Sequence, residues 1–315
     1  MNLIASLQAA LPAQPLSSTP SLYVVATPLG NIADISLRAL ALLAAVDVIA
    51  AEDTRHSKRL LDAYGVRTRL LAVHQHNEQE AAGGLIALLQ AGQHIALISD
   101  AGTPAVSDPG GRVVARVRAA GFPVVPIPGP CAAIAALSAA GFAEGGFRFV
   151  GFLPARPAAR RSVLENLRDE ADVLVFYEAP HRVRESVADL CAVFGGQSGG
   201  QSGGERELVV ARELSKLHEQ IVRLPLNQAL AWFDADTNHC RGEFVLLVEG
   251  KRAQEGLDAE AERVLRLLLT ELPLKGAVAL AADICRQPRK LLYARALELR
   301  EAGEAATEAL AEPPS

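Results

Sequence analysis

Two short segments of the sequence each combine a carboxylate, an imidazole and a guanidinium. They are residues 52–56 (Glu-Asp-Thr-Arg-His) and residues 178–182 (Glu-Ala-Pro-His-Arg). A carboxylate or an imidazole can act as a general base, and a guanidinium can bind an anion. Both segments follow apolar runs, so we expect them at the ends of buried strands, facing a cleft. The alternative is helix capping, by Asp53 or Thr54 in the first segment and by a proline-initiated helix in the second.

A third segment, residues 98–111, is a long loop rich in Gly, Pro, Ser and Asp. It separates a predicted strand from a predicted helix, the place where α/β sheets commonly bind ligands. It matches neither the dinucleotide pattern GxGxxG nor the triphosphate pattern GxxxxGK[ST]. We expect a cradle of backbone groups in which Asp100 and Asp108 accept hydrogen bonds from hydroxyl or ammonium groups. The alternative is a connection that needs Gly and Pro only for its turns.

Three further segments carry weaker signals. Residues 27–31 (Thr-Pro-Leu-Gly-Asn) follow the first strand, but a single glycine makes a poor phosphate loop. Residues 128–130 (Pro-Gly-Pro) form either a rigid turn or a ligand contact. Residues 74–77 (His-Gln-His-Asn) place two imidazoles on one face of a strand, and no third ligand lies at a useful spacing. We therefore expect no metal site there, only a polar cleft wall.

Alternating apolar runs and helical patterns organise most of the chain. We expect one α/β domain over 21–140, with a mainly parallel sheet covered by helices on both faces. After a linker at 141–146, a second α/β domain spans 147–250 and contains a flexible Gly/Gln/Ser insertion at 195–204. The first domain should contain strands at 22–26, 46–51, 70–73, 94–98 and 124–127, with helices at 36–45, 55–63, 78–91, 111–120 and 131–140. The second should contain strands at 147–152, 173–177, 208–212, 221–224 and 244–248, with helices near 158–169, 181–193 and 226–234.

The two ends of the chain have a different character. We expect residues 1–20 to form a loosely ordered extension and residues 302–315 to form a tail. Between the second α/β domain and this tail, three short amphipathic helices at 257–271, 275–286 and 289–301 form a small bundle that resembles a helix-turn-helix.

Composition restricts the class of protein. Half of the residues are hydrophobic and the net charge is −5, so no global basic field points to nucleic acid. Local basic clusters exist at Arg156, Arg160 and Arg161 and near residues 286–290. The four cysteines are scattered, residues 1–20 lack Lys and Arg, and no apolar run reaches about 18 residues. We expect a soluble, cytoplasmic protein without a membrane partner.

Taken in order, these segments resemble the tetrapyrrole methylase superfamily of S-adenosyl-L-methionine (AdoMet) dependent methyltransferases. The resemblance covers about 21–300 and rests on segments 27–31, 51–55, 76–78, 99–110, 128–130, 177–182, 211–216 and 242–244. It implies two α/β domains with AdoMet in the cleft between them, and a homodimer. The implied cofactor-binding residues are Pro28, Asp100, Ala101, Gly102, Val106, Ser107, Cys131, Ala132, Tyr177, Leu214 and Glu243. The family usually has a small polar residue where this chain has Cys131.

Within that superfamily, the chain is most similar to the branch that acts on ribosomal RNA. The implied reaction is 2′-O-methylation of a cytidine ribose in the decoding region of 16S rRNA, within the 30S subunit. A neutral 2′-hydroxyl is a poor nucleophile, so we expect Glu178 or His181 to act as the base. We expect Arg55 and Arg182 to stabilise a phosphate or an oxyanion. The target nucleotide should be splayed out, and the C-terminal bundle could supply a further RNA contact.

Two other functions remain open. One is methylation of a tetrapyrrole such as a corrin or sirohaem precursor. Those relatives tend to carry a glycine-rich loop with an acidic residue after the first strand, whereas this chain has residues 27–31. The other is a non-catalytic AdoMet or nucleotide sensor. The charged groups at 52–56 and 178–182 argue against the sensor, because binding alone does not need them.

Overall fold

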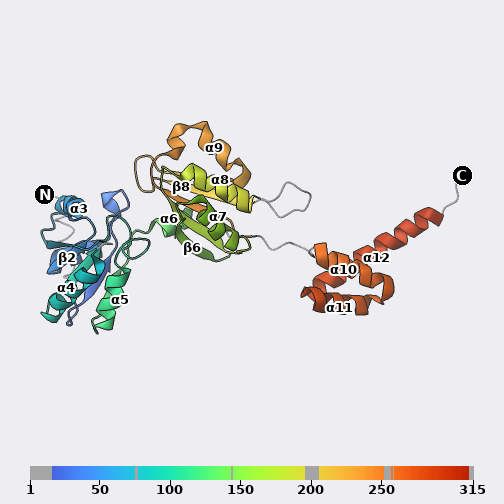
Figure 1. Ribbon diagram of the computed structural model, residues 1–315, viewed down its shortest axis with the longest axis horizontal. Helices are drawn as coiled ribbons and strands as arrows, with labels where there is room; N and C mark the ends of the chain where they lie inside the picture. Colours follow the sequence, from blue (N-terminus) through green and yellow to red (C-terminus); the bar gives the residue numbers. More distant parts are fainter. Residues whose placement is uncertain are drawn as a thin grey trace. The chain divides into compact units, whose positions relative to one another are not determined.

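The computed structural model describes residues 16–74, 77–142, 145–195, 206–251, 257 and 259–311, and side chains up to residue 300 (Figure 1). The chain forms two compact units. The described residues up to Lys251 belong to the first unit, which contains both sheets, and those from Leu257 onward form the second. Residues 196–204 of the segment expected as a flexible insertion and residues 1–15 of the N-terminal extension lie outside the described residues.

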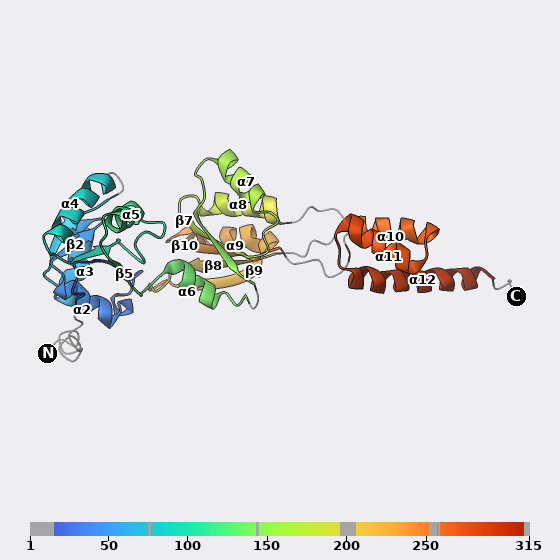
Figure 2. The same cartoon turned by 90° about the horizontal axis from the view of Figure 1, so that it is seen from below.

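The first sheet is entirely parallel, with strand order β3-β2-β4-β1-β5. Helices α2 and α3 cover one face, and α4 and α5 cover the other (Figure 2). The expected parallel sheet with two covered faces is therefore confirmed. The strands are β1 (Leu22–Val25), β2 (Val48–Ala51), β3 (Arg69–Ala72), β4 (Ile95–Ile98) and β5 (Val124–Ile127), and the helices are α2 (Leu37–Ala45), α3 (Thr54–Tyr64), α4 (Glu78–Gln90) and α5 (Gly111–Ala119).

Local sequence explains where these helices begin. The Ser36 side chain accepts a hydrogen bond from the backbone N–H of Ala39 and so caps α2. Asp53 caps α3 in the same way, and the left-handed Gly65 ends that helix. A 3-10 turn, η1 (Ile32–Asp34), is capped by Asn31. Short polar side chains thus set the starts of α2, α3 and η1, whereas α4 and α5 begin without a side-chain N-cap.

The second sheet is mixed, with strand order β6-β7-β10-β8-β9. Only β6 and β7 are parallel, and the remaining neighbours are antiparallel. Helices α7, α8 and α9 pack on one face of the sheet. The strands are β6 (Phe147–Phe152), β7 (Val173–Glu178), β8 (Glu207–Arg212), β9 (Gln220–Pro225) and β10 (Phe244–Val248), and the helices are α7 (Pro157–Asn166), α8 (Val183–Phe194) and α9 (Ala229–Ala235), with 3-10 turns η2 (Leu226–Gln228) and η3 (Thr237–Cys240).

Helix α6 (Ala132–Ala139) packs on the second sheet, although the sequence grouped it with the first. Its buried Ala133 and Ala136 lie against Val175 and Val245. Side chains alternate between the two faces of a strand, so Val175 faces α6 while Phe176 faces the helices of the opposite layer. The chain therefore joins the second sheet before its first strand begins, and the boundary expected after residue 140 falls inside this packing.

The second unit consists of α10 (Ala259–Glu271), α11 (Leu274–Cys285) and α12 (Arg289–Ala311). Leu265, Val278 and Leu292, one from each helix, meet in its core. The left-handed Arg286 ends α11, shortly before Pro288. Helix α12 continues through much of the segment expected as a tail. Among the described helices, none is both long and apolar enough to cross a membrane.

Candidate functional site

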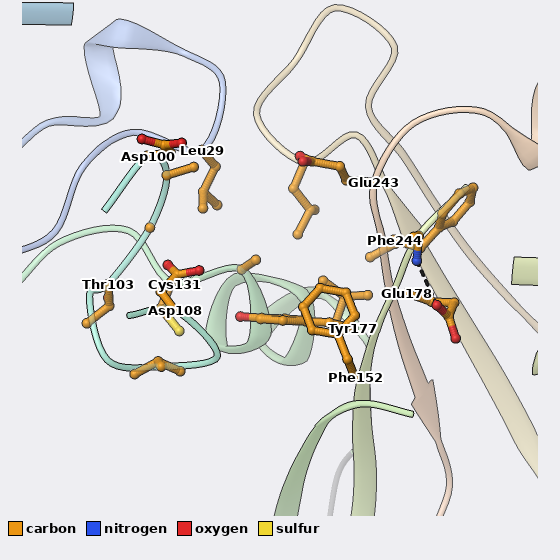
Figure 3. Close-up of a pocket in the computed structure, with 18 of the residues that line it drawn as sticks. Leu29, Asp100, Thr103, Asp108, Cys131, Phe152, Tyr177, Glu178, Glu243 and Phe244 are labelled. Carbon is orange, nitrogen blue, oxygen red and sulfur yellow. Dashed lines mark hydrogen bonds between the residues drawn. The ribbon is translucent and has the colours of Figure 1, made fainter. Parts of the chain in front are cut away.

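Within the first unit, a cavity of about 380 Å³ lies between the loops that follow the first-sheet strands and the strands of the second sheet. Figure 3 shows Asp100 and Asp108 on one side and Tyr177 and Phe152 on the other. Most of the expected cofactor-binding residues line the cavity, namely Asp100, Ala101, Gly102, Val106, Cys131, Ala132, Tyr177, Leu214 and Glu243.

The loop after β4 is joined to the loop after β1. Backbone hydrogen bonds connect Thr27 and Gly102 in both directions, at 2.8 and 3.0 Å. The Thr27 hydroxyl also donates to the carbonyl of Ser99 at 3.1 Å. Gly102 has a φ of +77°, and a Cβ there would lie 3.3 Å from a methyl of Leu29. Glycine thus allows a left-handed turn and a close approach at the cavity wall.

The far end of the same loop is tied down by a buried carboxylate. Glu78, at the start of α4, accepts a hydrogen bond of 2.5 Å from the backbone N–H of Gly110. Between these two anchors, Ala105 and Ser107 adopt positive φ angles of 67° and 61°. Such angles are costly for residues with a side chain and are found mainly where surrounding contacts enforce them. The loop is therefore held in one shape, with its backbone groups directed by the fold.

Two of the expected cofactor-binding residues do not line the cavity. Pro28 is buried beside it, and its neighbour Leu29 forms the wall. The Ser107 hydroxyl instead lies against Gly151 of β6, 3.0 Å from where a Cβ on that glycine would be. Both residues shape the loop rather than the surface of the cavity. The left-handed backbone at Ser107 turns its side chain away, which spacing along the chain does not predict.

Carboxylates dominate the electrostatics of the cavity, since Glu52, Asp100, Asp108 and Glu243 all line it. Burial raises the pKa of Glu52, and the nearby Asp100 and Asp108 raise it further. Burial also raises the pKa of Asp108, a hydrogen bond from Ser99 lowers it, and Asp100 and Glu243 raise it again. Crowded acidic groups of this kind favour a bound cation, which relieves their mutual repulsion. The cavity therefore suits a positively charged ligand.

The basic side chain of Lys216 approaches the carboxylates of the cavity. Lys216 forms ion pairs with Glu213 at 2.9 Å and with Glu243 at 2.7 Å. Its aliphatic stem passes so close to Gly30 that a Cβ there would clash with it. The segments 27–31 and 211–216, both part of the family resemblance, therefore meet at one edge of the cavity.

On the second-sheet side, Tyr177 organises the start of α6. Its hydroxyl accepts a hydrogen bond of 3.1 Å from the backbone N–H of Ala133, and burial raises its pKa. Cys131 occupies the N-cap position of α6 but makes no side-chain cap. The phenol of Tyr177 thus satisfies an N–H that a small polar residue at position 131 would otherwise bind.

Of the candidate bases, Glu178 is fully engaged with its own neighbours. Its buried carboxylate accepts from the Ser186 hydroxyl at 2.6 Å and from the backbone N–H of Ala179 at 2.8 Å, and it pairs with Arg182. Glu178 contributes to the cavity lining, but Figure 3 shows its carboxylate turned away from Asp100 and Asp108. With these contacts, Glu178 holds Arg182 in place. Its carboxylate is not free in the way that a general base would be.

The other catalytic candidates lie outside the cavity lining. His181 is exposed and directly follows Ala179 and Pro180, which line the cavity. Arg182 is only 17% exposed, and its guanidinium lies 5.9 Å from the ring centroid of Phe152.

The two interpretations of residues 52–56 both apply, each to a different residue. Asp53 caps α3, accepting hydrogen bonds from the backbone N–H groups of Arg55 and His56. Glu52 lines the cavity, and the side chain of Arg55 is 90% exposed beside Asp53. The segment therefore combines a helix cap, a cavity carboxylate and an arginine that faces solvent.

Sequence reasoning missed the aromatic and apolar residues of the cavity, notably Phe152, Phe244 and Leu29. Phe152 could have been predicted as a site residue, because it is an aromatic residue at the carboxyl end of an expected strand in a chain with few aromatic residues. Within the basic cluster, Arg160 is buried and pairs with Asp189 at 2.7 Å, which is a structural role, whereas Arg161 is exposed and pairs with the same carboxylate at 2.6 Å, and Arg156 is exposed. Within the described ranges, no group of three His, Cys, Asp or Glu residues could hold a metal ion, and His76 lies outside those ranges.

Comparison with known proteins gives matches along both units. The family model for Tetrapyrrole (Corrin/Porphyrin) Methylases matches residues 21–230, and that for the RsmI C-terminal HTH domain matches residues 255–300. Ribosomal RNA small subunit methyltransferase I of Pseudomonas aeruginosa is 54% identical over 284 residues, which cover 89% of this chain and 98% of that protein. The protein of the same name from Escherichia coli O157:H7 is 51% identical, covering 90% of this chain and 96% of that protein.

A solved structure shares the fold at much lower identity. It is uroporphyrin-III C-methyl transferase from Thermus thermophilus in complex with S-adenyl homocysteine. Its TM-score is 0.50 at 19% identity, with 73% of this chain and 97% of that chain covered.

Proposed function

Because the chain belongs to the tetrapyrrole methylase family, we propose that it methylates small-subunit ribosomal RNA with AdoMet as methyl donor. The observation that carries this proposal is the sequence identity to proteins named ribosomal RNA small subunit methyltransferase I. This identity is above 50% over about nine-tenths of the chain. The similarity includes the C-terminal helices, which the RsmI C-terminal HTH domain model also matches. The finer proposal is 2′-O-methylation of a cytidine ribose in the decoding region, within the 30S subunit.

The cavity fits AdoMet on chemical grounds. AdoMet carries a positive sulfonium and an ammonium group, which suit the carboxylates Glu52, Asp100, Asp108 and Glu243. The adenosine needs apolar walls and polar acceptors, which Leu29, Leu214 and the loop backbone supply. We propose that the cofactor is held by Asp100, Ala101, Gly102, Val106, Cys131, Ala132, Tyr177, Leu214 and Glu243, with Pro28 and Ser107 supporting the loop from behind.

When bound, AdoMet supplies an electrophilic methyl group. The protein then has to bind the RNA, exclude water and remove a proton from the 2′-hydroxyl. We propose His181 as the base, because it is exposed and next to the cavity. Glu178 acts through Arg182, which it holds beside Phe152 of the cavity lining. Arg182 and the exposed Arg55 are proposed as contacts for RNA phosphate or for the developing oxyanion.

Labelled AdoMet tests this function. The purified protein is incubated separately with 30S subunits lacking the modification, with free 16S rRNA and with a tetrapyrrole precursor. Digestion of labelled RNA to nucleosides should yield 2′-O-methylcytidine from the 30S sample. Label in the tetrapyrrole alone would instead support the corrin or sirohaem alternative. The absence of label from all three would support a sensor.

Two further properties are proposed on the family resemblance. We propose a homodimer, which light scattering of the purified protein would measure as twice the 33.3 kDa chain mass. We also propose a cytoplasmic location, where ribosomal subunits are assembled and modified.

A further inference from the structure

Phe152 presents an aromatic ring at the edge of the cavity. It ends β6, lines the cavity and is 53% exposed, whereas aromatic residues make up only 4% of the chain. An exposed aromatic ring at the edge of a cavity offers a flat apolar surface on which a ligand can stack. The ring of Phe152 is therefore available to a ligand that enters the cavity.

A β-bulge directs this ring to its position. Phe149 and Phe152 are three residues apart, so in a regular strand they would face opposite sides of the sheet. The register between β6 and β7 shifts between Phe149 and Gly151, and this shift pairs Phe152 with Tyr177. Both phenylalanine rings consequently contact Tyr177 edge-on, with centroids 5.0 and 5.6 Å away. Bulges next to active sites commonly redirect a side chain in this way.

The bulge also connects the ring to the loop that forms the opposite wall. Gly151 has a φ of +76°, and the Ser107 hydroxyl lies against it. The absence of a side chain at Gly151 therefore lets the loop at Ser107 pack closely on the strand end that carries Phe152. The ring and the proposed cofactor loop are parts of one packed arrangement.

The ring is supported by fixed neighbours. Besides Tyr177, the guanidinium of Arg182 lies 5.9 Å from the ring centroid of Phe152. The buried carboxylate of Glu178 holds that guanidinium, and Ser186 holds Glu178 at 2.6 Å. A ring supported in this way loses little conformational entropy when a second flat group stacks on it.

We propose that Phe152 is the stacking platform for the nucleobase of the nucleotide that the protein methylates. This inference rests on the proposed function, because it takes the substrate to be RNA. Unpaired bases that proteins read are typically splayed out and stacked on aromatic rings or guanidinium planes. The Arg182 guanidinium lies over one face of the Phe152 ring, 5.9 Å from its centroid, and the exposed remainder of the ring is the surface on which a base can stack. Across the cavity, Asp100 and Asp108 suit the cationic cofactor, so the neutral base belongs on the aromatic side (Figure 3).

Two substitutions of Phe152 test the proposal, because they separate the effect of the aromatic ring from the effect of a large apolar side chain. F152L keeps an apolar side chain but removes the ring, and F152W keeps a ring. Methyl transfer to unmodified 30S subunits is measured at saturating AdoMet, and binding of S-adenosylhomocysteine is measured by calorimetry. We expect F152L to lower kcat/KM for the 30S subunit roughly ten- to hundred-fold, F152W to stay near the wild type, and both variants to bind S-adenosylhomocysteine normally.

Phe147 provides a matched control. It begins the same strand, is 45% exposed and does not line the cavity, so F147L should leave all these constants unchanged. If F152L is as active as the wild type, the platform is wrong while the proposed function stands. If F152L weakens S-adenosylhomocysteine binding as much as it weakens turnover, the ring serves the cofactor and the inference is also overturned. A wild-type protein that methylates no ribosomal substrate would overturn the proposed function, and this inference with it.

Discussion

Glu178 and Arg182 form an ion pair beside the cavity, with side-chain exposures of 1% and 17%. The two residues are four positions apart, and the pair lies where β7 gives way to α8. Ser186 and the backbone of Ala179 complete the hydrogen bonding of the carboxylate. The pair therefore holds a guanidinium beside Phe152 with almost no exposure of its negative partner.

The ion pair predicts that substituting Glu178 will affect stability and turnover together. Removing one partner of a buried pair leaves an uncompensated charge, so E178A should lower the free energy of unfolding by about 3–5 kcal/mol. E178Q should keep more of that stability but still reduce methylation, because Arg182 loses its charged anchor. Denaturant unfolding and initial rates on 30S subunits would measure both effects.

The control for this prediction is Glu165 on α7, whose pair with Arg168 is half exposed. E165A should change the unfolding free energy by less than about 1 kcal/mol. If E178Q instead abolished turnover with no change in RNA affinity and with an altered pH–rate profile, Glu178 would be the base after all.

A substitution of His181 tests the base directly. General-base catalysis typically contributes about 10²- to 10⁴-fold, so H181A should lower kcat by roughly that factor while leaving S-adenosylhomocysteine affinity unchanged. His218, also exposed and outside the cavity lining, is the control, and H218A should be fully active. Rapid-quench methylation assays across the pH range would measure the loss. A fully active H181A protein would remove His181 from the mechanism.

The raised pKa of Asp108 predicts how stability and cofactor binding respond to pH. The native state binds this proton more tightly than the unfolded chain, whose carboxyl pKa is about 3.9. The contribution of Asp108 to stability is therefore fully present below that value and is lost as pH rises through the higher folded pKa. At neutral pH, D108N should stabilise the ligand-free protein and weaken binding of AdoMet, since it removes a charge that both repels neighbouring carboxylates and attracts the cation.

Thermal unfolding of the wild type and D108N at pH 7 and at acid pH would measure this effect. The stability difference should shrink at acid pH, where the wild-type carboxyl is itself protonated. A D108N protein that is less stable than the wild type at neutral pH, or that binds AdoMet more tightly, would contradict the assignment.

The anchor between Glu78 and Gly110 predicts a loss of cofactor affinity without any contact to the cofactor. E78A would leave the buried N–H of Gly110 without its acceptor, a loss of about 1.5–3 kcal/mol for a charged hydrogen bond. The loop after β4 should then loosen, and S-adenosylhomocysteine should bind more weakly in calorimetry. E80A alters an exposed glutamate on the same helix and should have no effect. Equal affinities for E78A and the wild type would show that the loop keeps its shape unaided.

The sequence predicted the local structure and the place of the site because both depend on short-range patterns. Apolar runs and helical periods identified the strands and helices, and most boundaries shift by only a few residues, although α12 continues ten residues beyond its expected end. Asp53 was recognisable as a candidate cap because its side chain bonds to backbone groups two and three residues away. The loop at 98–111 was recognisable because Gly, Pro and Asp turn the backbone wherever they occur.

Only the tertiary structure decided which candidates face the cavity. Glu178 and His181 are three positions apart, yet one is buried in an ion pair and the other is exposed. The bulge that directs Phe152 depends on the pairing of two strands, and the position of α6 depends on which sheet accepts its alanines. These features arise from contacts between segments distant in the chain. Residue types and local spacing by themselves determined the elements and the turn-rich loop at 98–111, and long-range packing determined which side chains can reach a substrate.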